Sequence, residues 1–399
     1  MQFEKSRRLR RSLLAVTVLY VVVFAQVPFF TARSAPPPTV NFDWTPKSAV
    51  IGNLLNFNAT ATGGTPPYTY SWNFGDGQTG TGVTVLHPYN RPGFYSVALN
   101  VSDSSGAFNV LTQSVMIYDW PVRTYNWLIH WNATADDGFN IWDVSYKGVP
   151  LIRDARLAYV VNDYLENFCG PFQDETASSG LQGTLASGNL RYENFTTASD
   201  PYFQIRTEYP VGGYNYQEVF RFYLSGRWEP EILIGRGGCI ADHIYKPMWR
   251  IDIVLGEDSN NFMSQYTPYR TWENLIWEGN YVDNGFRDPT HNAAQWRMGH
   301  QGMYYYMIPK IFRVDTDLPN LPTSIYLVRA HPNEIQFQHS LECYPNPCED
   351  PSEFINGELA FRRDIAIWFI PRIWDHGPID TTSPQKVATL SFYPGGSWP

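Results

Sequence analysis

The sequence predicts an all-β protein that is large enough for two or three domains. Aromatic residues make up 16% of the 399 positions, and such residues favour strands over helices. The 30 glycines and 30 prolines supply turns between short segments. Apolar and polar side chains alternate within many of these segments, as in a half-buried strand, whereas the 3.6-residue period of a helix is nowhere sustained.

The first 34 residues predict export. Residues 5–12 are basic and residues 13–30 are almost wholly apolar, which is the pattern of a secretory signal or of an N-terminal membrane anchor whose basic flank stays inside. Small residues suited to cleavage occur within 23–25 and 32–34, so removal and anchoring both stay open. Either outcome predicts a secreted or cell-surface protein.

The formal net charge of −9 argues against a nucleic-acid partner and weakly favours a cationic substrate such as an amine. Four cysteines fit an oxidising compartment. Cys343 and Cys348 bracket a Tyr-Pro-Asn-Pro turn that a disulfide could close, and Cys169 and Cys239 would then pair by default, although four cysteines allow three connectivities. Sequons, which matter only in a host that glycosylates, begin at Asn58, Asn100, Asn132 and Asn194.

The first folded unit is expected at residues 40–118, after a stiff linker at 35–39 (APPPT). Three motifs lie in it: Trp72-x-Phe74-Gly-Asp76-Gly, His87-x-Tyr89, and the alternating run from Gly93 to Asp103. On these motifs the segment closely resembles a PKD domain, an immunoglobulin-like β-sandwich that acts as a spacer or adhesion module. Trp72 is expected to be buried, and packing or turn roles account for Asp76 and His87.

The second unit is expected at residues 120–399, after a boundary at Asp119-Trp120-Pro121. It begins with a strand-like segment, residues 131–146. Further strands are predicted at 218–224, 228–234, 248–255, 303–308, 324–330, 364–370 and 386–393.

Residues 211–232 predict a β-hairpin. Tyr214, Tyr216, Phe220 and Phe222 recur at every second position, with Glu218 as the polar exception. A Leu-Ser-Gly turn follows, and the chain then returns as a second strand.

On this hairpin, and on segments 131–158, 242–252 and 352–378, the second unit resembles the catalytic domain of copper-containing amine oxidases. The resemblance implies a large, mainly antiparallel β-sandwich. In that family a hairpin tyrosine within T-x-x-N-Y-D/E is oxidised to topaquinone, and Tyr214 matches it. Pro210, Gly213 and Asn215 replace the family's Thr, Asn and acidic residue.

The resemblance also implies a copper site. Three histidines hold the metal in the family, two of them as an H-x-H pair on a strand that ends in R-x-D. Anchoring on Arg250 and Asp252 places His243 at the first ligand and Tyr245 at the second, and the i, i+2 spacing puts both on one strand face. His376, before x-Pro, matches the third ligand.

Two carboxylate roles follow from the same resemblance. Asp174, in Phe-Gln-Asp-Glu, is the nearest match to the aspartate that removes a proton from the amine. Asp252 and Asp364 match two carboxylates of a peripheral calcium site, while Val254 replaces the third.

The implied activity is oxidation of a primary amine, with O₂ and water, to an aldehyde, ammonia and hydrogen peroxide. Its cofactors would be copper and topaquinone made from Tyr214. The replaced residues leave two alternatives open. One is an inactive amine-oxidase fold kept as a binding or structural module. The other is a cell-surface protein whose sandwiches serve adhesion or assembly, as a homo-oligomer or with a surface partner.

Overall fold

The computed structural model describes residues 36–47, 49–134, 138–164, 172–175, 190–211, 214–235, 242–312, 321–331, 348, 350–375 and 386–398. Within these ranges the regular elements are strands, apart from one short 3-10 helix, η1 (Pro351–Phe354). The predicted all-β fold class is therefore confirmed. Residues 1–34, Cys169, Gly213, Cys239, Cys343 and His376 lie outside the described residues.

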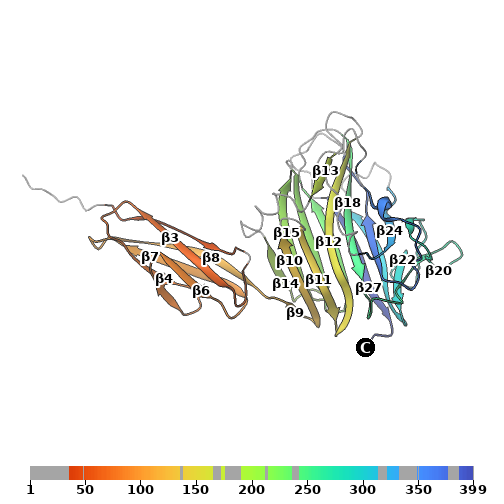
Figure 1. The fold of residues 1–399 in the computed structure, drawn as a ribbon, viewed down its shortest axis with the longest axis horizontal. Coiled ribbons are helices and arrows are strands. Elements are labelled where there is room, and N and C mark those ends of the chain that lie inside the picture. The colour runs from red at the N-terminus through yellow and green to blue at the C-terminus, as the bar shows by residue number, and fades with distance from the viewer. Residues whose placement is uncertain are drawn as a thin grey trace, which may run out of the picture.

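The first unit is a sandwich of two sheets. One has the order β1 (Thr39–Thr45), β3 (Leu54–Thr62), β6 (Thr84–Pro88). The other has the order β2 (Ala49–Val50), β8 (Phe108–Tyr118), β7 (Gly93–Ser102), β4 (Thr69–Asn73), β5 (Thr79–Thr81). Figure 1 shows this unit at the left of the view.

The core of the first unit is aromatic, as its motifs predict. Trp72 is 1% exposed, and its ring meets Phe42 edge-on at 5.1 Å and stacks on Phe74 at 6.2 Å. His87 stacks on Phe74 at 3.9 Å and lies 2.9 Å from the Asp76 carboxylate. His87 and Asp76 thus fasten the turn after β4 to β6, which agrees with the packing and turn roles expected for them.

The second unit pairs a ten-stranded with a nine-stranded sheet. The ten-stranded sheet runs β21 (Gly279–Val282), β24 (Ser324–Arg329), β25 (Ile365–Ile370), β18 (His243–Ile253), β12 (Val149–Tyr164), β11 (Gly138–Tyr146), β10 (Trp127–Thr134), β9 (Val122–Thr124), with β13 (Phe172–Glu175) beside β12 and β26 (Ile373–Asp375) beside β18. The nine-stranded sheet runs β14 (Arg191–Phe195), β15 (Tyr202–Val211), β16 (Tyr214–Tyr223), β17 (Trp228–Ile234), β27 (Lys386–Gly396), β23 (Met303–Phe312), β22 (Trp296–His300), β19 (Phe262–Tyr266), β20 (Trp272–Asn274).

Large aromatic side chains join the two sheets of the second unit, which we call the larger sandwich. Phe220 of the nine-stranded sheet meets Trp249 of the ten-stranded sheet edge-on at 5.3 Å, and Phe222 meets Trp127 at 5.0 Å. All four side chains are at most 2% exposed. Because neighbouring strands in both sheets of this unit pair antiparallel, the predicted antiparallel sandwich is confirmed.

The predicted hairpin is β16 and β17. Its strands pair from Tyr216 with Ile234 to Phe222 with Trp228, and Gly226 in the turn has φ +88°, which favours glycine. Glu218 breaks the apolar alternation yet is fully buried. Its carboxylate accepts a hydrogen bond from the Leu157 N–H, at 3.1 Å, where β12 carries an irregularity. Glu218 thus satisfies a backbone N–H group at an irregularity in the opposite sheet.

The outer face of the ten-stranded sheet has its own apolar cluster. Phe354 of η1 stacks on Trp368 of β25 at 5.5 Å, so this turn covers part of the sheet. Cys348, just before it, is disulfide-bonded. Its predicted partner Cys343 lies outside the described residues, so the pairing stays a prediction.

Candidate functional site

Five polar side chains of the larger sandwich lie at the ends of strands, at the same end of the fold. Tyr164 is the last residue of β12 and His243 the first of β18, and the two are paired across the ladder. His243 also pairs with Asp375, the last residue of β26. Tyr214 and Lys386 begin β16 and β27 of the other sheet. We call these five residues, together with Tyr245, the strand-end cluster.

Tyr214 lies inside the sandwich rather than on its surface. Its side chain is 4% exposed, and its hydroxyl forms a hydrogen bond with the Tyr164 hydroxyl. Its ring stacks near Tyr216 at 5.7 Å and stands perpendicular to Tyr245 at 5.9 Å. Burial, with the negative charge of Asp375, raises the pKa of Tyr214 to about 12. Its phenol is therefore protonated at neutral pH.

His243 and Tyr245 project from one face of β18, as their spacing predicts. Their rings lie 4.6 Å apart, and both face the same carboxylate oxygen. The Tyr245 hydroxyl donates to Asp375 Oδ2 at 3.3 Å, and His243 Nε2 lies 3.6 Å from that atom. Burial and the Asp375 charge raise the pKa of Tyr245.

Lys386 completes this group from the nine-stranded sheet. Its ammonium lies 2.7 Å from Asp375 Oδ1, and the residue is 9% exposed. Asp375 thus faces Tyr245 and His243 with one oxygen and a lysine with the other.

Asp174 is linked to Tyr214 through Tyr216, which contacts both. Its strand, β13, pairs with β12 so that Asp174 is opposite Val160. Its carboxylate accepts hydrogen bonds from Tyr216 at 2.5 Å and from Asn162 at 2.6 Å. Burial raises the pKa of Asp174, although both hydrogen bonds lower it. A buried carboxyl of raised pKa has the character of a general base.

The donors of the strand-end cluster fit a transition-metal ion. An imidazole nitrogen, a phenol oxygen and a carboxylate oxygen meet at Asp375 Oδ2, and this mixture suits copper. Within the described ranges, no three His, Cys, Asp or Glu side chains form a group that could hold a metal. The proposed ligand set therefore needs the phenol of Tyr245. The remaining predicted ligand, His376, directly follows Asp375 but lies outside the described residues.

The predicted calcium ligands lie in a network of arginines. Arg153 donates to Asp364 at 3.1 Å, and Arg250 lies 3.5 Å from Asp252. Asp252 Oδ1 and Asp364 Oδ1 are buried without a hydrogen-bond partner, and burial raises the pKa of Asp252 to about 6. These oxygens suit a cation, whereas the guanidinium of Arg153 already places positive charge beside them. Calcium binding stays a prediction.

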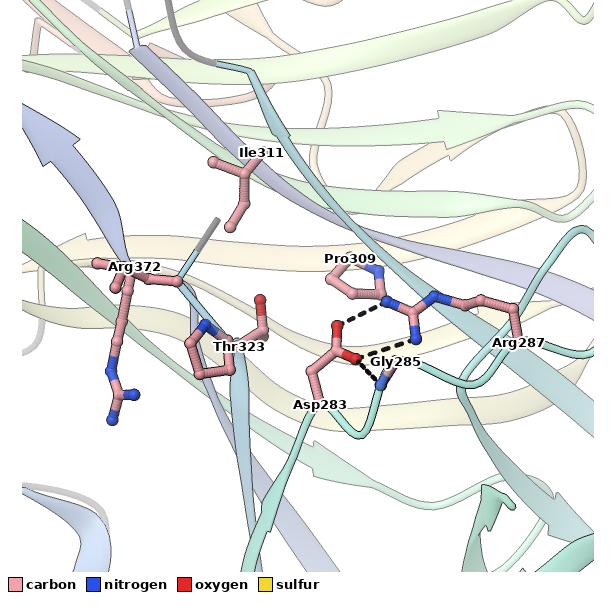
Figure 2. A pocket seen from close by; sticks show the side chains of 9 residues that line it. Asp283, Gly285, Arg287, Pro309, Ile311, Thr323 and Arg372 are labelled. Carbon is pink, nitrogen blue, oxygen red and sulfur yellow. Dashed lines mark hydrogen bonds and ion pairs between the residues drawn. The ribbon is translucent and has the colours of Figure 1, made fainter. Parts of the chain in front are cut away.

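A cavity of about 380 Å³ lies beside the link from β25 to β26. Figure 2 shows Arg287 bound to Asp283 and the Arg372 side chain directed away from that pair. One acidic and two basic side chains leave an excess positive charge, which does not favour an ammonium group. The cavity is lined by Asp283, Gly285, Arg287, Pro309, Ile311, Leu321, Pro322, Thr323 and Arg372.

Sequence reasoning missed Asp375, Lys386 and Tyr164. Asp375 directly precedes the predicted ligand His376, which is the one local signal that could have identified it. Lys386 and Tyr164 carry no such signal, because sheet pairing and the contact between the two sheets bring them to the site.

Residues 35–118 match the family model of the PKD domain, which confirms that prediction. Collagenase ColA of Bacillus cereus is 36% identical over 162 residues, or 36% of this chain and 17% of that protein. Collagenase ColA of Clostridium perfringens is 30% identical over 82 residues, and pre-pro-metalloprotease PrtV of Vibrio cholerae is 28% identical over 88. The chain spans 7% and 10% of these two relatives.

Solved structures similar to this one include copper-containing amine oxidases. A benzylamine oxidase from Hansenula polymorpha is 11% identical, with a TM-score of 0.48, over 90% of this chain and 77% of that one. Lysyl oxidase from Pichia pastoris is 12% identical, also with a TM-score of 0.48, over 89% and 69%. Values this low do not transfer activity or site residues. Among the described residues, no helix is long and apolar enough to cross a membrane.

Proposed function

We propose that the larger sandwich is a copper-dependent primary-amine oxidase that acts outside the cytoplasm. The observation that carries the proposal is the contact of Tyr214 with two functional groups. Its ring stacks on Tyr216, which holds the buried carboxylate of Asp174. It also meets the rings of Tyr245 and His243, which face Asp375. A precursor tyrosine, a base and metal donors thus lie together.

The reaction removes two electrons and one proton from the carbon that bears the amine and a second proton from its nitrogen, and water then releases the aldehyde and ammonia. O₂ takes up the two electrons and two protons to give hydrogen peroxide. Copper and a quinone made from Tyr214 would supply the electron acceptor. Asp174 is the proton acceptor, because its carboxylate is buried and its pKa is raised. Tyr216 and Asn162 orient that carboxylate, and Tyr164 fixes the Tyr214 ring through its hydroxyl.

The runner-up proposal is a binding module without catalysis. Two observations favour it. The Asp375–Lys386 ion pair places a positive charge beside the metal donors. Asn215, next to Tyr214, is exposed and replaces the acidic residue that the resemblance has there. The PKD domain and the collagenase relatives make an adhesive or binding role reasonable for the chain.

The test uses the purified full chain, loaded with Cu(II) in air. Bound copper is measured by elemental analysis, the protein is treated with phenylhydrazine, and the visible spectrum is scanned for a coloured quinone adduct. Peroxide release is then assayed with a panel of primary amines. We expect one copper per chain, an adduct and amine-dependent peroxide, with the adduct lost in Tyr214→Phe. Bound copper without an adduct would indicate a metal-binding site that has lost its activity. If neither copper nor an adduct is found, the binding module is the better proposal.

A further inference from the structure

The Asp375 carboxylate is the centre of the strand-end cluster. Its Oδ2 faces Tyr245 Oη at 3.3 Å and His243 Nε2 at 3.6 Å, while its Oδ1 faces Lys386 Nζ at 2.7 Å. These residues come from β26, β18 and β27, so both sheets contribute. The His243, Asp375 and Lys386 side chains are 2%, 16% and 11% exposed.

The spacing of these atoms is that of neighbouring ligands around one ion. Donors about 2.0–2.1 Å from a tetrahedral metal lie about 3.3 Å from one another. The two separations that involve Asp375 Oδ2, 3.3 and 3.6 Å, lie close to this value. Rotation of the side chains about their own bonds would have to bring the three atoms onto one ion.

The charges at Asp375 explain how the carboxylate is held when no metal is bound. A buried, unpaired carboxylate is costly, and a lysine in contact offsets that cost. Lys386 is the one lysine or arginine in contact with Asp375 among the described residues. A divalent ion at His243 and Tyr245 would lie near this ammonium, so ion and lysine compete for the same carboxylate.

We propose that Asp375 is a metal ligand together with His243 and Tyr245, and that Lys386 is a built-in counter-ion that competes with the metal. The inference rests on the metal site of the proposed function, but it assigns two residues that the amine-oxidase resemblance does not supply. Lys386 lowers the affinity for the metal and keeps the ligand in position until the metal arrives.

The test is calorimetric titration of the full chain with Cu(II), with folding of each variant checked by circular dichroism. Asp375→Asn should weaken binding about tenfold or more, because the anionic donor is lost. Lys386→Met keeps the length of the side chain and removes its charge, so binding should tighten about tenfold. The matched control is Lys246→Met. Lys246 pairs with Asp163 at 2.5 Å on β18 and β12, and its loss changes the net charge equally but should leave the affinity as it is.

The outcomes separate the inference from the proposed function. If the wild type binds Cu(II) and Asp375→Asn binds equally well, the ligand assignment is wrong while the oxidase proposal stands. If Lys386→Met binds more weakly, or if Lys246→Met has the same effect as Lys386→Met, the counter-ion role is wrong. If Lys386→Met binds copper and the wild type does not, the inference holds and the oxidase proposal fails. If neither binds, both are wrong.

Discussion

Three buried carboxylates of the larger sandwich are held by specific donors. Asp174 accepts from Tyr216 and Asn162, and Glu218 accepts from a backbone N–H of the opposite sheet. Glu278 accepts from the backbone N–H groups of three residues, Arg329, Asn356 and Glu358. Because unpaired buried polar groups are costly, these donors hold each of the three carboxylates in place inside the sandwich.

The hydroxyl of Tyr216 tunes Asp174, and removing it should change the pH dependence of amine oxidation. Its hydrogen bond stabilises the carboxylate and so lowers the pKa of Asp174. Tyr216→Phe should raise that pKa further, since a hydrogen bond to a charged group contributes about 1.5 kcal/mol. A base must be deprotonated to act, so the acidic limb of the pH–rate profile should move to higher pH. An unchanged limb would exclude Asp174 as the base.

At the residue scale, the sequence predicts several residues of the candidate site but misses Asp375. Tyr214, His243, Tyr245 and Asp174 are identified by motif and are brought together by the fold. Asp375 is missed because the family motifs give it no role, and its contacts depend on the pairing of β18 with the three-residue strand β26.

Among the elements, the long alternating strands are the ones that sequence predicts well. The hairpin of β16 and β17 forms where its apolar period indicates. The predicted strand at 248–255 begins instead at His243, because Pro247 and the polar residues before it hide a strand that pairs with β12 and β26. β26 has too few residues for any period to appear.

The irregularity in β12 depends on Glu218, and its loss should destabilise the larger sandwich. Glu218→Leu leaves the Leu157 N–H without its acceptor inside the core, at a cost of about 1–3 kcal/mol. Glu218→Gln keeps an oxygen at that position and should cost less. Urea unfolding followed by tryptophan fluorescence compares the two variants, and equal midpoints for them would mean that the hydrogen bond contributes nothing.

Considered as a whole, the molecule has two separate cores. The first contains the aromatic cluster around Trp72, and the second begins at Tyr118. Tyr118, at the end of β8, donates a hydrogen bond to the Leu190 carbonyl of the larger sandwich. Motifs predicted the two units because each carries its own pattern, whereas this contact joins residues 72 positions apart and has no local signal.

Separate cores should melt separately. Trp72→Ala removes a side chain that is 1% exposed and should cost the PKD domain about 3–5 kcal/mol. Calorimetry of the full chain should show two transitions in the wild type, with the variant lowering or abolishing one and shifting the other little. Phe94→Ala is the matched control, because Phe94 is 69% exposed in the same unit. Equal shifts of both transitions would mean that the cores unfold as one.

The position of the cluster at strand ends has a consequence for the history of such a chain. Tyr164, Tyr214, His243, Asp375 and Lys386 each begin or end a strand, while the side chains that join the sheets, such as Phe220 and Trp249, lie further along the same ladders. Mutations at the cluster can therefore exchange ligands and charges while the strands and the side chains that join the two sheets stay the same. A lineage built this way can lose an activity, or acquire one, by a few substitutions at the strand ends of an unchanged fold.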